Sequence, residues 1–244
     1  MCGEHAEEHQ PAVHGVAACA RRRVRSRVVI TGWDASGSTC VYQIAKALGL
    51  EAVKSHSLPR ARRRDFTIFC YRDPRDIIVS NARRVHREMW QSEGPEAALG
   101  RALDDFLHND YVAALYRSAE MAKVFFMRYE TYFSENRGVL IDMIADNFLL
   151  PLTRERRAQI LADTSLESNI ARSQKLSGFQ TWCADSLIHG HHISNFGVSG
   201  AWKECFTPAI ERRVKACLDG VIIDLGYERT PDWSAGRPGE SAPC

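Results

Sequence analysis

The sequence predicts a single α/β domain, in which a parallel sheet of about five strands is flanked by helices on both faces. Short β-branched or aromatic runs alternate along the chain with segments of helical periodicity, a pattern typical of parallel sheets. The chain has 244 residues and 45% hydrophobic side chains, which is enough for one large core. Its apolar runs are shorter than the roughly 18 residues that indicate a membrane-spanning helix.

Individual elements follow from these patterns. Strands are predicted at residues 28–31, 51–55, 66–71 and 124–129, and helices at 41–48, after Pro74, at 96–121 and at 136–149. Gly49 is expected to end the first helix, because glycine readily takes the left-handed conformation found there. We expect residues 27–228 to form the domain, with flexible tails at residues 1–26 and 229–244.

Composition excludes several classes of protein. The 32 basic and 30 acidic side chains leave a net charge of +2, whereas a nucleic-acid-binding domain is usually clearly basic. The chain begins MCGEHAEEHQ, which lacks the apolar core of a signal peptide. The eight cysteines include no Cys-x-x-Cys pair, so we expect reduced thiols in a cytoplasmic protein. Neither a nucleic acid nor a membrane is an expected partner.

A candidate phosphate-binding loop follows the first predicted strand. Gly32 and Gly37 are spaced as Gly-x-x-x-x-Gly, Ser38 stands where such loops carry lysine, and Thr39 follows. Glycines let the backbone wrap around a phosphate, and the positive end of the following helix adds to the attraction. Without the lysine, an ordinary nucleoside-triphosphate hydrolase is disfavoured.

A second anion-binding pattern follows the third predicted strand, in the stretch Arg72-Asp73-Pro74-Arg75-Asp76 that leads to Ser80. Arg72 offers a bidentate guanidinium, and Ser80 lies about two helical turns later with a hydroxyl. If Asp73 begins a helix, the helix N-terminus also faces the anion. The alternative is a capped helix start with local salt bridges.

This stretch resembles the 3′-phosphate-binding motif of sulfotransferases that use 3′-phosphoadenylyl sulfate (PAPS). Other segments are similar to later parts of that family's pattern, in the family's order: Ser36-Gly37-Ser38-Thr39, Met127-Arg128-Tyr129-Glu130, Asp163-Thr164-Ser165-Leu166 and Gly197 to Thr207. The resemblance implies PAPS as donor, adenosine 3′,5′-bisphosphate (PAP) as product and no metal requirement. It implies donor-binding positions at Ala35, Ser36, Gly37, Ser38, Thr39, Cys40, Arg72, Ser80, Tyr129, Thr164, Leu166, Asn195, Phe196 and Gly197.

Two catalytic residues are implied by a further resemblance. Lys54-Ser55-His56-Ser57-Leu58-Pro59 is similar to the segment of cytosolic sulfotransferases in which histidine is the general base. In an extended chain Lys54 and His56 share a face. His56 could take the proton of an acceptor hydroxyl or amine, and Lys54 could neutralise charge on the sulfuryl group. The acceptor is expected to be a small molecule.

The sequence departs from the family pattern at five positions. Ala35 replaces the usual lysine or arginine, Asn195-Phe196 replaces Arg-Lys, Cys40 replaces tryptophan, and Ala201 replaces aspartate. The missing cations leave open a catalytically impaired nucleotide-binding protein, and a P-loop kinase is a further alternative. Arg60 and Arg62–Arg64 are candidate compensating cations.

Two weaker patterns remain. His189-Gly190-His191-His192 lacks carboxylate or thiolate partners at ligand spacing, so a loop is favoured over a metal site. The segment from Lys203 to Glu211 is near the dimer motif of cytosolic sulfotransferases, with a spacing that differs by one residue, and hints at a homodimer.

Overall fold

A computed structural model describes residues 27–55, 65–121, 123–133, 136–178, 180–190, 193 and 197–236. The predicted positions His56, Asn195 and Phe196, the predicted N-terminal tail 1–26 and the candidate cations Arg60 and Arg62–Arg64 lie outside these residues. The strands are β1 Arg27–Gly32, β2 Glu51–Lys54, β3 Phe66–Tyr71 and β4 Val124–Arg128. The helices are α1 Ser38–Ala47, α2 Pro74–Arg84, α3 Arg87–Ser92, α4 Pro95–His108, α5 Tyr111–Ala119, α6 Tyr129–Tyr132, α7 Arg137–Asn147, α8 Arg154–Asp163, α9 Leu166–Gln174, α10 Trp202–Cys205 and α11 Pro208–Asp224.

The strands form one parallel sheet with the order β2-β1-β3-β4, which confirms the α/β prediction. Among the described residues the sheet has four strands rather than the predicted five or so. The physical reason lies after β4, where the described chain forms helices and turns. Its remaining β-structure is an isolated antiparallel bridge between Trp182 and His189.

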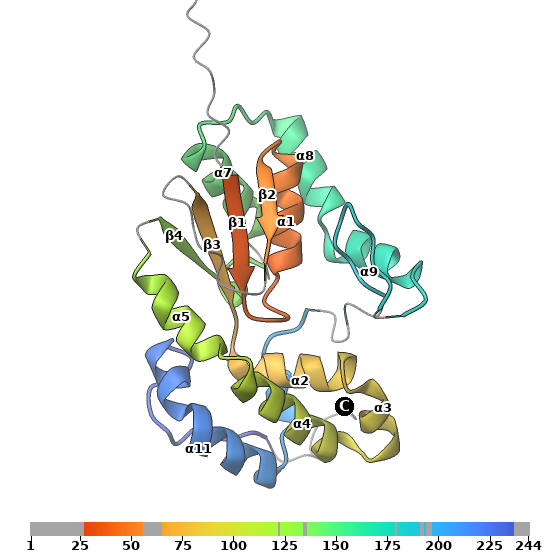
Figure 1. Cartoon of the computed structure of the whole chain (residues 1–244), viewed down its shortest axis with the longest axis vertical. Helices are drawn as coiled ribbons and strands as arrows, with labels where there is room; N and C mark the ends of the chain where they lie inside the picture. The colour runs from red at the N-terminus through yellow and green to blue at the C-terminus, as the bar shows by residue number, and fades with distance from the viewer. Residues whose placement is uncertain are drawn as a thin grey trace, which may run out of the picture.

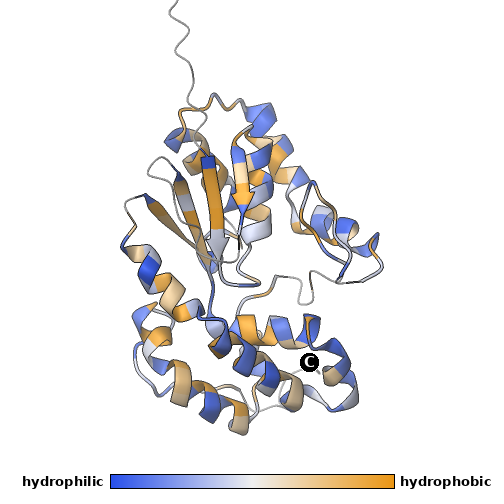
Figure 2. Cartoon of the chain, viewed as in Figure 1, coloured by the Kyte–Doolittle hydropathy of each residue, from blue (hydrophilic) through white to orange (hydrophobic). Residues whose placement is uncertain are grey.

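Two hydrophobic cores cover the two faces of the sheet. Successive strand residues point to opposite faces, so Ile68 and Cys70 of β3 join one core while Phe69 joins the other. The first core packs α1 and α7 against the sheet, and the second packs α2, α4 and α11 together. Figure 1 shows the sheet with α1, α7 and α8 in one half and the helices α2, α3, α4 and α11 in the other. Apolar residues run along the strands in Figure 2.

The observed helix boundaries differ from the predicted ones at two places. The first helix begins at Ser38 and has Leu48 as its C-cap, after which Gly49 has a φ of 80°, as predicted for the end of this helix. The helix predicted over 96–121 is two helices, because Asp110 takes a left-handed φ of 54° between α4 and α5. None of the helices in the described part of the chain is long and apolar enough to cross a membrane.

Trp233 is buried, although it lies in the predicted C-terminal tail. It is 6% exposed, its ring packs edge-on against Trp202 at 5.3 Å, and its Nε1 donates to Asp219 at 2.7 Å. The packed part of the chain therefore extends beyond residue 228.

Candidate donor site

The carboxyl ends of the central strands meet at one edge of the sheet. The register pairs Gly32 of β1 with Cys70 of β3, and the chain continues from these strands into α1 and α2. Strand β1 lies between β2 and β3, so the connections that leave β1 and β3 diverge at this edge. In parallel sheets ligands bind at such a point, where the strand order reverses.

The Gly32–Thr39 loop has the backbone geometry that the glycine spacing predicts. Gly32 has a φ of 129°, and any side chain there would overlap the Cys70 carbonyl. Gly37 is the N-cap of α1 with a φ of 83° and provides no capping side chain. The first N–H groups of α1 therefore have no side-chain cap and can bind an anion.

The hydroxyl groups of this loop have different partners. Ser36 is fully buried and its Oγ donates to the Trp33 carbonyl at 2.5 Å, so this hydroxyl proton braces the loop itself. Ser38 and Thr39 are buried in the first turn of α1. Thr39 Oγ1 accepts a hydrogen bond from Lys54 Nζ at 2.7 Å, which joins β2 to the loop.

Lys54 is a half-buried cation beside the loop. Burial lowers the pKa of Lys54 to about 8, while the negative charge of Asp34 acts in the opposite direction. An anion bound in the loop would favour the protonated lysine in the same way as Asp34. Lys54 can thus supply charge that the loop itself lacks at Ala35, which takes a left-handed φ of 52°.

Arg72, which follows β3, is held by contacts to the two Nη groups and to the face of its guanidinium. It is 4% exposed, with Nη2 donating to the Val198 carbonyl at 2.5 Å and Nη1 lying 3.4 Å from the Ala35 carbonyl. Its charge lies 4.2 Å from the centre of the Tyr129 ring and 3.6 Å from Asp76 Oδ2. Its Nε is buried without a hydrogen-bond partner in the described part of the chain.

The start of α2 is fixed in the way that the sequence predicts. Asp73 is the N-cap, and its carboxylate accepts from the Arg75 N–H at 2.9 Å. Arg75 is 1% exposed and lies 3.8 Å from the Trp202 ring, with its Nη1 donating to Glu228 at 2.7 Å. The N-terminus of α2 is therefore rigidly placed next to Arg72. Ser80 is buried on the same helix.

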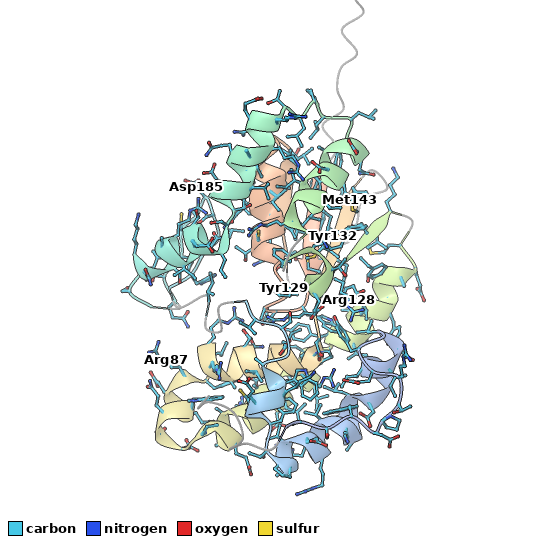
Figure 3. The ribbon with its side chains drawn as sticks, turned by 180° about the vertical axis from the view of Figure 1, so that it is seen from behind. Arg87, Arg128, Tyr129, Tyr132, Met143 and Asp185 are labelled. Atoms are coloured by element: carbon cyan, nitrogen blue, oxygen red, sulfur yellow. The ribbon has the colours of Figure 1, made fainter. Side chains whose placement is uncertain are left out.

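The segment from Gly197 to Gly200 packs at the same edge of the sheet. Tyr129 Oη donates to the Gly197 carbonyl at 3.0 Å, and a side chain at Gly197 would lie 3.9 Å from Leu166. Asp76 accepts from the Gly200 N–H at 2.7 Å, which ties this segment to α2. Figure 3 shows Tyr129 where the sheet meets the helical half.

Cys40 and Thr164 also meet. The Thr164 carbonyl accepts from Cys40 Sγ at 3.5 Å and from Arg137 Nη1 at 3.0 Å. Burial raises the pKa of the Cys40 thiol to about 11, which favours the neutral thiol over the thiolate. Printed contacts thus join Arg72 to Ala35 and Tyr129, and Cys40 to Thr164, whereas the role of these residues in donor binding stays a prediction.

The family model of the sulfotransferase domain matches residues 53–226, well over half of the chain. The chain belongs to the sulfotransferase family. Among solved structures, this sulfotransferase resembles mouse sulfotransferase SULT7A1 complexed with PAP. The TM-score is 0.57 at 14% identity, over 83% of this chain and 86% of that one. No curated protein sequence gives a significant match.

Three charged or polar residues of this sulfotransferase were not predicted as parts of the site. Asp34 hydrogen-bonds to Tyr111 and attracts both Lys54 and Arg84. Arg84 is buried, and its Nη2 donates to Asn81 Oδ1 at 2.8 Å. A signal for Asp34 existed in its position within the Gly32–Thr39 loop, whereas Arg84 and Tyr111 come from distant helices and give no local signal. The described residues contain no cluster of His, Cys, Asp and Glu that could hold a metal ion.

Proposed function

We propose that this protein transfers a sulfuryl group from PAPS to a hydroxyl or amine of a small-molecule acceptor. The observation that carries the proposal is the buried Arg72 beside the capped start of α2, at the same sheet edge as the glycine loop. A PAPS molecule carries two anionic ends, a 3′-phosphate and a 5′-phosphosulfate. Arg72 with Ser80 would hold the first, and the Gly37–Thr39 loop with Lys54 the second.

The reaction we propose is an in-line displacement at sulfur. The acceptor oxygen or nitrogen forms a bond to sulfur while the bond between sulfur and the bridging oxygen of the 5′-phosphate breaks. His56 removes the acceptor proton, and the negative charge of the leaving group develops on that phosphate oxygen of PAP. Lys54 and the N–H groups at the start of α1 would stabilise this charge.

Thermal unfolding with PAP, compared with ATP and Mg²⁺, tests the donor site. A ligand at 100 times its dissociation constant stabilises the fold by about 2.7 kcal/mol, which is roughly 5–10 °C for a chain of this size. We expect the shift with PAP. A shift with ATP and Mg²⁺ alone would contradict the proposal and favour a P-loop kinase.

Turnover then tests the reaction. Transfer of ³⁵S from PAPS should be measured with 2-naphthol and 2-naphthylamine, a matched hydroxyl and amine pair, alongside a broader panel of phenols, alcohols and amines. We expect His56→Ala to keep PAP affinity within about twofold and to lose at least about 100-fold in turnover. Unchanged turnover would remove His56 from the mechanism. PAP binding without turnover on any acceptor would favour the catalytically impaired alternative.

A further inference from the structure

Phe133, just after α6, forms part of an aromatic stack in the donor site. Its ring lies 4.8 Å from that of Tyr129 with an angle of 12° between the planes. It also packs on the glycine loop, because a methyl group at Gly37 would lie 2.6 Å from the ring. Phe133 therefore touches both the loop and the ring that contacts Arg72.

This position lies between the two predicted phosphate-binding groups. If Arg72 holds one phosphate of a nucleoside bisphosphate and the Gly37 loop holds the other, the nucleoside must lie within reach of both. Proteins commonly bind nucleobases by stacking them on aromatic side chains, because every base has a π-face. Cys40 offers no such ring.

Arg137, at the first residue of α7, lies on the Cys40 side of the same site. Its Nη1 donates to the Thr164 carbonyl, which Cys40 Sγ also contacts. Its Nε is buried and has no hydrogen-bond partner among the residues that the structure describes. The guanidinium also hydrogen-bonds to the Cys40 thiol. A planar guanidinium can stack on a base through its face, and its Nη groups can donate to a ring nitrogen.

We infer that Phe133 and Arg137 form the base-recognition site of the donor, with the Phe133 ring as the stacking platform and the Arg137 guanidinium as a polar contact to the purine. The inference rests on the proposed function, since it assigns residues to the base of the same nucleotide. Phe133 and Arg137 would then supply the contacts to the base that the family's tryptophan, replaced here by Cys40, no longer provides.

The Phe133 assignment is tested by PAP binding in calorimetry, with a thermal melt of each variant to confirm folding. We expect Phe133→Tyr to bind PAP within about threefold of the unchanged protein. Phe133→Leu and Phe133→Met, which keep an apolar side chain without the ring, should bind about tenfold more weakly.

Phe148→Leu is the matched control. Phe148 packs edge-on against Phe66 at 5.4 Å, and Phe66 begins β3, at the opposite end of the strand from the site. This variant should bind PAP as the unchanged protein does. Equal binding by the tyrosine, leucine and methionine variants at position 133, or equal loss in all three, would overturn the stacking role.

The Arg137 assignment needs a variant that separates base contact from a structural role. Arg137→Lys keeps a donor for the Thr164 carbonyl but lacks the planar guanidinium, whereas Arg137→Met removes both. We expect both variants to bind PAP about fivefold more weakly. Full recovery with lysine would show that Arg137 only braces the end of α8, and would overturn its role in recognition.

PAP binding by the unchanged protein distinguishes a failure of the base site from a failure of the proposed function. If it binds PAP and the variants at positions 133 and 137 bind equally well, the base-site inference fails while the proposed function stands. If the unchanged protein does not bind PAP at all, the proposed function fails, and the inference fails with it.

Discussion

The two halves of the donor site hold their charge in different ways. On the α2 side, Arg72 and Arg75 are almost fully buried and fixed by carboxylates, carbonyls and aromatic rings. On the loop side, Ala35 stands at the position of the expected cation, and the half-buried Lys54 reaches in from β2. A preorganised cation binds its anion at little conformational cost, so we expect the α2 side to supply most of the donor affinity.

We expect the largest change in PAP affinity from Arg72→Ala. Removing a buried guanidinium from a phosphate site costs about 3 kcal/mol, so PAP should bind at least about 100-fold more weakly. Calorimetry measures the change, and Arg101→Ala, on the exposed face of α4, is the control. A loss below about fivefold would mean that the α2 side is not the dominant anchor.

A second test uses the pH dependence of the loop side. Because the pKa of Lys54 is lowered to about 8 by burial, and because a bound anion raises it again, protonation of Lys54 is linked to donor binding. PAP affinity should be constant with respect to this group below pH 8 and should fall by up to about tenfold between pH 8 and 9.5. Lys54→Met should bind more weakly at pH 7 and lose this fall. An unchanged pH profile in that variant would assign the titration to another group.

The smallest effect is expected at Ala35. Restoring a cation with Ala35→Lys should tighten PAP binding about three- to tenfold, since a partly exposed charge pair contributes only modestly. Ala35→Gly is the matched control, because it relieves the left-handed φ of 52° and should stabilise the fold by about 1 kcal/mol without changing affinity. Equal affinity of the lysine and glycine variants would indicate that Lys54 already satisfies the loop.

The local features of the site were predictable because they depend on neighbours in the chain. The turn at Gly32 and Gly37, the cap at Asp73 and the placement of Arg72 at a strand end follow from spacing and residue type. The break at Asp110 was missed, since a single left-handed residue interrupts a helix without interrupting its apolar pattern. We predicted about five strands, whereas the described residues form four. We also assigned the segment around Trp233 to a tail, although this tryptophan is buried.

The sequence by itself determined the alternating α/β order, the glycine loop, the capped start of α2 and the membership of the sulfotransferase family. Only the tertiary structure decided which distant residues complete the site. Lys54 reaches Thr39 because β2 lies next to β1, and Phe133 covers Gly37 because α6 follows β4 at the same sheet edge. Such contacts join residues that are far apart in the chain, so local periodicity carries no signal for them, and the strand order fixes them.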